Sequence, residues 1–200
     1  MPSIKLQAKF VEKIWGRDVV PNHPIDKLGK RIGELWFDCP KGTTPPLLVK
    51  YIYTSEQRSI QLHTGGDCVG KEECWYILDA EPASVVGIGT IFPLDRQSLH
   101  DAAASGGVER LIDWRPARPG DFYFVPAGTI HAIGAGISLV EVQQKIDLTY
   151  RLDSYDRARL TQVESDIPAW QADPRPAAAL HRPLGCSGVL LEPDSKVSQA

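Results

Sequence analysis

Apolar and polar residues alternate along many short segments of this chain. Period-two alternation, or an enrichment in β-branched and aromatic residues, marks eight segments: 4–10, 47–53, 58–63, 75–79, 84–89, 121–125, 137–143 and 148–152. A period of two is typical of a strand that buries one face. Many short strands separated by Gly and Pro indicate an antiparallel sandwich or barrel. The pattern therefore predicts an all-β fold.

One segment departs from this pattern. After Pro93, the residues Leu94, Leu99 and Ala102 fall near one face of a helix. The glycine pair at 106–107 is a natural stop signal for that helix. We therefore expect one short helical excursion, around residues 94–105, between two strands.

The composition changes near residue 157. Residues 165–186 contain four prolines and a run of three alanines, with little periodicity. A chain of 200 residues suits one domain with an appendage. We expect residues 1–157 to form the barrel, and residues 158–200 to form a Pro/Ala-rich tail that packs on the barrel or trails from it. A short strand at 188–191 could form within this tail.

Charge and cysteine usage narrow the class of protein. The 22 basic and 25 acidic residues give a net charge of −3, which argues against nucleic acid or a membrane surface as partner. No apolar run approaches the ~18 residues of a spanning helix, and the N-terminus lacks the apolar core of a signal peptide. The four cysteines are scattered without a CxxC pair. They are interpreted as reduced thiols of a cytoplasmic protein.

Three segments contain residues that could bind a metal ion. Gln61 and His63 lie two apart on a predicted strand, so they share a face. Glu73 stands just before another strand, and His131 follows a Pro-Ala-Gly turn. Imidazole and carboxylate are good ligands for a divalent cation, and an amide oxygen is a weaker one. Taken alone, each of these residues is more often a satisfied polar group, so the prediction of a metal site depends on their combination.

The third segment matches a known motif. Gly120, Pro126, Gly128 and His131 fit the pattern G-x5-P-x-G-x2-H, the second motif of the cupin superfamily. Gln61-x-His63 followed by Glu73 resembles its first motif, in a form similar to class I mannose-6-phosphate isomerase. The stretches that support the resemblance are KIWGRD, IGELW, PLLVKYI, SIQLH, GKEECWYIL, PGDFYFVPAGTIHAIG and EVQQKIDLTYRLDSYDR. They span about residues 5–157.

The resemblance implies a cupin fold, which is a jelly-roll barrel, and a metal-dependent enzyme. It implies one Zn²⁺ per chain, with other divalent metals as alternatives, held by Gln61, His63, Glu73 and His131. It also implies an active-site Glu141 and Arg151, ten residues apart, with Lys71 near the substrate. The implied reaction is the aldose–ketose interconversion of mannose 6-phosphate and fructose 6-phosphate through a cis-enediol. Lys71 and Arg151 are then the expected contacts of the sugar phosphate.

Alternatives remain open at this point. Arg151 and Glu141 could instead form a structural ion pair at the barrel mouth, and the proton-transfer base is not assigned. Residues 64–66 differ from the Pro and acidic residues usual in the family, and familiar members carry further domains. The substrate could therefore be another aldose, with or without a phosphate, or the chain could be a sugar-binding cupin without turnover. The chain is expected to be a monomer or a homodimer.

Overall fold

Two antiparallel sheets make up the fold in the computed structural model, which describes residues 6–20, 30–40, 47–63, 71–145 and 149–153 and the backbone of 181–183. The larger sheet has the strand order β1-β2-β3-β10-β5-β8-β12. Its strands are β1 (Gln7–Arg17), β2 (Ile32–Asp38), β3 (Leu47–Tyr53), β5 (Glu73–Ala80), β8 (Asp121–Val125), β10 (Ile137–Gln144) and β12 (His181–Pro183). The smaller sheet has the order β11-β4-β9-β6-β7. Its strands are β4 (Ile60–Leu62), β6 (Val85–Thr90), β7 (Ile112–Pro116), β9 (His131–Ile133) and β11 (Tyr150–Asp153).

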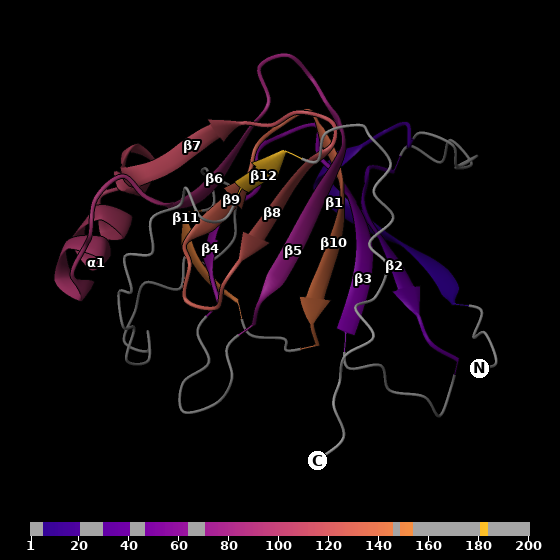
Figure 1. Cartoon of the computed structure of the whole chain (residues 1–200), viewed down its shortest axis with the longest axis horizontal. Helices are drawn as coiled ribbons and strands as arrows, with labels where there is room; N and C mark the ends of the chain where they lie inside the picture. The colour runs from indigo at the N-terminus through magenta and orange to yellow at the C-terminus, as the bar shows by residue number, and fades with distance from the viewer. Residues whose placement is uncertain are drawn as a thin grey trace.

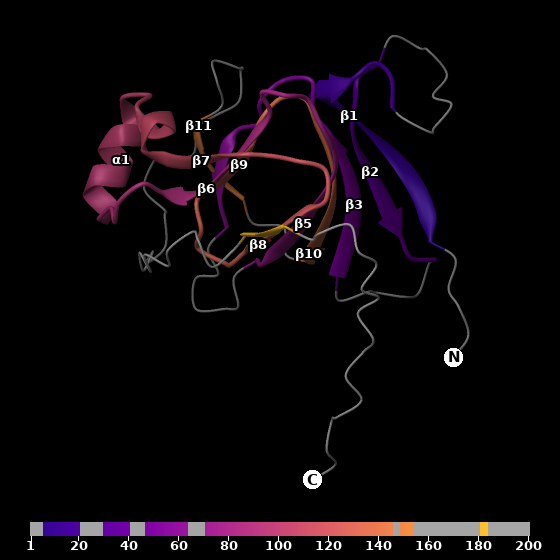
Figure 2. The same cartoon turned by 45° about the horizontal axis from the view of Figure 1, so that its top comes forward.

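The two sheets face each other as in a jelly roll (Figures 1 and 2). The helix α1 (Arg96–Ala104) and the 3₁₀ turn η1 (Val108–Leu111) lie at one end of the molecule, beside β6 and β7, while β1 and β2 extend the larger sheet at the other end. The all-β prediction is confirmed. The helical excursion is also confirmed, and the side chain of Asp95 caps it by accepting a hydrogen bond from the Ser98 amide at 2.7 Å.

Four of the described strands form where the alternation pattern predicts none, namely β2, β7, β9 and β12. Strand β9 has only three residues, too few for a period to show, and it is held by pairing with β4 and β6. Strand β1 runs to Arg17, well beyond the predicted end at residue 10. The proposed strand at 188–191 and most of the segment 158–200 lie outside the described residues, so the division into barrel and tail stays a prediction.

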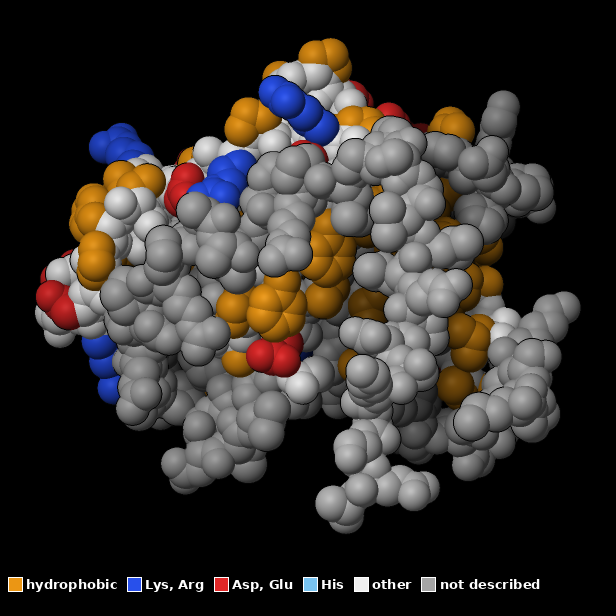
Figure 3. Space-filling view, in the orientation of Figure 1, with side chains coloured by type: hydrophobic (Ala, Val, Ile, Leu, Met, Phe, Trp, Pro, Cys, Tyr) orange, Lys and Arg blue, Asp and Glu red, His pale blue; other side chains and the backbone are white. Residues whose placement is uncertain are grey.

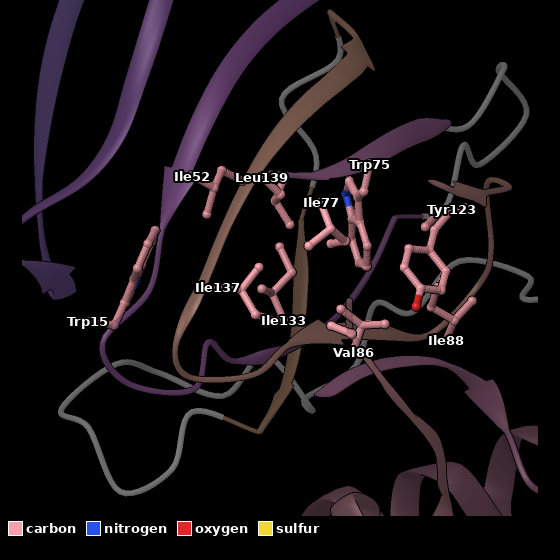
Figure 4. Close-up of a cluster of buried hydrophobic side chains, with 12 residues drawn as sticks. Trp15, Ile52, Trp75, Ile77, Val86, Ile88, Tyr123, Ile133, Ile137 and Leu139 are labelled. Atoms are coloured by element: carbon pink, nitrogen blue, oxygen red, sulfur yellow. The ribbon is translucent and has the colours of Figure 1, made fainter. Parts of the chain in front are cut away.

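The main core fills the space between the sheets (Figure 4). Ile52, Trp75, Ile77 and Leu139 from the larger sheet belong to one buried cluster with residues of the smaller sheet, including Ile133. A second cluster attaches α1 and η1 to the smaller sheet through residues such as Leu99 and Val108. On the face shown in Figure 3, hydrophobic side chains are visible in several patches between the residues that are not described. Among the described residues, no helix is long and apolar enough to cross a membrane.

The inward-facing positions of three neighbouring strands change character along their length. On β10 they run from Ile137 and Leu139 to Glu141 and Gln143, all of them buried. Strand register sets Glu141 opposite Lys50 on β3 and Trp75 on β5, and it sets Gln143 opposite Glu73. Because paired residues share a face, one end of the space between the sheets is apolar and the other end is lined by charged groups. This polar end contains the candidate site.

Candidate active site

Three predicted ligands come together at the polar end of the sandwich. His63 follows β4, Glu73 begins β5 and His131 begins β9, and each is at most 4% exposed. One ligand atom from each residue lies within 4.8 Å of the other two. The Nε2 atom of His63 is 3.2 Å from Oε1 of Glu73, and Nε2 of His131 is 3.8 Å from Oε2 of Glu73. We refer to His63, Glu73 and His131 below as the ligand triad.

The turn before His131 fixes the orientation of its ring. Gly128 has a φ of 79°, a conformation that side chains rarely adopt, and its amide donates to the carbonyl of His63 at 2.8 Å. The Nδ1 atom of His131 lies 2.8 Å from the carbonyl oxygen of Thr129, so Nδ1 carries the proton that it donates. Burial lowers the pKa of His131 to about 3, which keeps the imidazole neutral. The lone pair on Nε2 is therefore free to bind a metal ion, with Nδ1 oriented as in many metal sites.

Glu73 is held as a carboxylate by its neighbours. Burial alone would raise the pKa of Glu73, but the close approach of His63, His131 and Lys71 outweighs it and holds the pKa well below the ordinary value. The Nζ atom of Lys71 is 2.6 Å from Oε1 of Glu73 and 3.2 Å from Nε2 of His63. The indole Nε1 of Trp75 donates to Oε2 of Glu73 at 3.1 Å. Both carboxylate oxygens are thus oriented within the triad.

The donor set fits a small divalent cation. Ligand atoms about 2.1 Å from a tetrahedral ion lie about 3.4 Å from one another. The histidine contacts of Glu73, 3.2 Å to Oε1 and 3.8 Å to Oε2, are near that spacing, and one ligand atom from each of the three residues lies within 4.8 Å of the others. Two neutral imidazoles and one carboxylate are also a suitable donor set for such an ion. Gln61 is opposite His131 in the strand register, so it shares that face, and its Nε2 donates to Oγ of Ser59 at 2.7 Å. Gln61 as a fourth ligand stays a prediction.

A cavity of about 410 Å³ opens beside the triad, a size typical of a small-molecule site. The predicted site residues that line it are Gln61, Lys71, Glu73, His131, Glu141 and Arg151. Arg151 lies on β11 opposite Gln61 on β4. The structure therefore brings residues from five strands or their ends to one cavity wall. The loop 64–66, whose sequence departs from the family, lies outside the described residues.

Glu141 has partners that the sequence did not indicate. The Nζ atom of Lys50 is 2.8 Å from Oε1 of Glu141 and 2.9 Å from Oε1 of Gln143, and it lies 5.1 Å from the ring centroid of Trp36. The other oxygen of Glu141 is 3.9 Å from a guanidinium nitrogen of Arg58. Glu141 is therefore ion-paired within the described residues, through Lys50 and Arg58.

Glu34 is a further buried carboxylate that lines the cavity. Oε1 of Glu34 is 3.6 Å from Arg58 and Oε2 is 3.6 Å from Lys13, and the indole of Trp36 donates to Oε2 at 2.8 Å. Burial would raise the pKa of Glu34, but the cations Arg58, Lys50 and Lys13 outweigh it and lower the pKa below the ordinary value. This part of the cavity lining therefore combines carboxylates and cations that are shielded from solvent, and charge interactions are strong there.

Lys50, Glu34 and Arg58 are the site residues that sequence analysis missed. A signal exists for Lys50, since the period of two places it on the same face as Leu48 and Ile52 in an otherwise apolar strand. A lysine on a buried face needs a charged partner, which is a functional clue. No comparable signal marks Arg58, which precedes β4 and packs its guanidinium 4.7 Å from the ring centroid of Trp15.

Comparison with known proteins identifies the family. No protein-family model matches the sequence. The mannose-6-phosphate isomerase of Streptococcus mutans is 35% identical over 141 residues, which cover 67% of this chain and 44% of that protein. The mannose-6-phosphate isomerase ManA of Bacillus subtilis is 35% identical over 156 residues, which cover 71% of this chain and 49% of that protein. The chain belongs to the mannose-6-phosphate isomerase family.

Solved structures agree with this assignment. The crystal structure of the mannose 6-phosphate isomerase from Bacillus subtilis has a TM-score of 0.63 at 29% identity, over 77% of this chain and 62% of that one. A phosphomannose isomerase from Salmonella typhimurium has a TM-score of 0.66 at 13% identity and shows the shared cupin fold. The chain spans about half the length of the curated relatives that it matches.

Proposed function

We propose that this member of the mannose-6-phosphate isomerase family is a metal-dependent isomerase that interconverts mannose 6-phosphate and fructose 6-phosphate. The observation that carries the proposal is a cavity lined by two members of the ligand triad, Glu73 and His131, together with Lys71, Glu141 and Arg151. A protein that only bound a sugar would need the cavity and not this set of acid, base and cationic groups.

Zinc is the metal that we propose, held by the ligand triad with Gln61 as the fourth ligand. A bound divalent ion would supply Lewis acidity, which stabilises the negative charge that develops on sugar oxygens. The same nitrogen and oxygen donors also suit Mn²⁺, Co²⁺, Ni²⁺ or Fe²⁺, so the choice among these metals is part of the test.

The chain's own residues supply the proton transfers. Isomerisation removes the proton on C2 of the open-chain aldose and returns a proton to C1, while one hydroxyl proton passes between O2 and O1. Oε1 of Glu141 accepts a hydrogen bond from Lys50 at 2.8 Å, whereas Oε2 is 3.9 Å from Arg58 and is the better placed acceptor. We propose Oε2 of Glu141 as the base and Lys71 as the group that moves the hydroxyl proton. Arg151, whose guanidinium stays charged, would stabilise the enediolate or bind the phosphate.

The test is an isomerase assay on the purified full chain with added zinc. Mannose 6-phosphate, unphosphorylated mannose and other aldoses are offered separately, and ketose formation is followed. We expect turnover of mannose 6-phosphate that disappears on chelation and returns with zinc. The variant Arg110→Met is a suitable control, because it removes an exposed arginine on η1, away from the cavity.

The outcomes separate the possible functions. Turnover of unphosphorylated sugars alone would refute the phosphosugar assignment and leave an isomerase of another aldose. No turnover of any sugar, in protein that retains stoichiometric metal, would refute the enzyme and leave a sugar-binding cupin. A cytoplasmic location and a monomer or homodimer remain predictions from the sequence, tested by fractionation and by sedimentation.

A further inference from the structure

Lys71 has contacts that its proposed role near the substrate does not require. Its ammonium group is 2.6 Å from Oε1 of Glu73 and 3.2 Å from Nε2 of His63. The Lys71 side chain is only 8% exposed and that of Glu73 only 2%. Glu73 and His63 therefore direct acceptor atoms toward a cation that belongs to the chain itself.

The charge of the triad explains this arrangement. Glu73 is the single acidic member and is buried, so one positive charge nearby stabilises its carboxylate. Lys71 supplies that charge from two residues away on the chain. An ammonium group has three donors and no acceptor, so it can satisfy Glu73 and His63 together.

A metal ion and this ammonium group need the same atoms. An ion held by the triad would take the Oε1 or Oε2 oxygen of Glu73 and the Nε2 lone pair of His63, the atom that Lys71 contacts. Two positive charges a few ångströms apart in a buried site also repel strongly. Both effects oppose the simultaneous presence of the metal and of Lys71 in its present position.

We infer that Lys71 is an intramolecular competitor of the metal. It neutralises Glu73 in the metal-free protein, and it leaves the triad when a divalent cation binds. The released ammonium group then lies in the same cavity, where the proposed reaction needs it. The inference depends on the metal site of the proposed function and not on turnover, so metal binding can test it directly.

The experiment removes metal from the full chain, adds zinc back, and measures zinc affinity by competition with a chromophoric chelator. Lys71→Met keeps the apolar stem and removes the charge, so we expect zinc to bind at least about tenfold more tightly than to the wild type. Lys71→Arg keeps the charge and should bind zinc much as the wild type does. Lys30→Met removes an exposed lysine paired with Glu12 and should leave the affinity unchanged.

Thermal unfolding of the same proteins gives an independent readout. Metal-free Lys71→Met should unfold at a lower temperature than the metal-free wild type, because Glu73 is left buried without its cation. Saturating zinc should remove or reverse that difference. If Lys71 had only a structural role, Lys71→Met would lower the unfolding temperature equally in the metal-free and the zinc-saturated protein. That result would overturn the inference.

A labelling experiment on the wild type avoids any dependence on the folding of variants. An amine-reactive ester should modify Lys71 several-fold faster in the zinc-loaded protein than in the metal-free protein, with Lys30 as the internal reference in peptide mass spectrometry. Equal labelling, or unchanged zinc affinity in Lys71→Met, would overturn the competition while leaving the metal site and the isomerase proposal intact. Failure of the wild type to bind zinc at all would instead refute the site itself.

Discussion

Lys50 provides a quantitative test of the charged wall of the cavity. Its ammonium group is 2.8 Å from Glu141 and 2.9 Å from Gln143, and the Lys50 and Glu141 side chains are 8% and 3% exposed. Removing one partner of a buried ion pair leaves the other charge uncompensated, which typically costs about 3–5 kcal/mol. We therefore expect Lys50→Met to lower the free energy of unfolding by roughly that amount, with Arg58 too distant from Glu141 to compensate fully.

The assay is urea unfolding of the metal-free protein, followed by tryptophan fluorescence. Stripping the metal matters because bound metal would stabilise the folded state and mask the difference. The double variant Lys50→Met/Glu141→Gln should be more stable than Lys50→Met alone, since the amide no longer buries a charge, with a coupling on the order of 1–3 kcal/mol. Lys30→Met is the matched control, because the Lys30–Glu12 pair is equally close but its side chains are 53% and 56% exposed.

The buried Lys50–Glu141 pair and the exposed Lys30–Glu12 pair should differ in their contribution to the free energy of unfolding. Lys30→Met should cost under about 1 kcal/mol, as exposed ion pairs usually do. A free energy of unfolding for Lys50→Met within about 1 kcal/mol of the wild type would refute the view that Lys50 neutralises Glu141 in a shielded wall. An unchanged dependence of stability on urea concentration would show that the variants unfold from the same folded state.

Three further predictions concern a buried hydroxyl, acid stability and catalysis. Thr54→Val should cost about 1–3 kcal/mol in urea unfolding, because the hydroxyl accepts from the Ile137 amide at 2.9 Å and donates to a backbone carbonyl, and both would lose their partner; a neutral result would contradict this. Because the pKa of His131 is lowered to about 3, the unfolded chain takes up a proton that the folded protein does not as the pH falls below about 6.5. Metal-free protein should therefore lose up to ~1.4 kcal/mol per pH unit between pH 6 and pH 4, and His131→Gln should flatten this slope while the exposed His100→Gln should not. Arg151→Ala should lower kcat on the order of 100-fold with its zinc content unchanged by elemental analysis, and loss of zinc or of fold would show that Arg151 is structural.

The sequence predicts the parts of the fold that depend on local pattern. The strand β8 and the helix α1 follow from alternation and from helix stop signals, and the structure places both close to their predicted bounds. Strand β9 could not be predicted in this way, because its three residues are ordered by pairing with β4 and β6. The motif around His131 predicts the ligand and its turn more sharply than the strand that holds it.

The residues of the site also divide into those that local sequence predicts and those that it does not. His63, Glu73 and His131 could be predicted because motif spacing reflects a local requirement for a turn and for ligand geometry. The partners of Glu141 could not, since Lys50 and Arg58 are 91 and 83 positions away along the chain. Lys50 meets Glu141 through the pairing of β3 with β10, and Arg58 meets it from the segment before β4 of the other sheet. Contacts of that kind depend on register, which no single segment of sequence encodes.

The change from apolar to charged residues along β10 also restricts how the chain can fold. A slip of two residues would keep the same face inward and would leave the alternation of β10 against β3 and β5 satisfied. It would, however, move Glu141 to the level of Leu139, opposite Ile52 and Ile77 in the apolar core, instead of opposite Lys50. The charged groups that line the cavity therefore also fix the register of β10, the central strand. They make the observed pairing of β10 with β3 and β5 more stable than a pairing shifted by two residues.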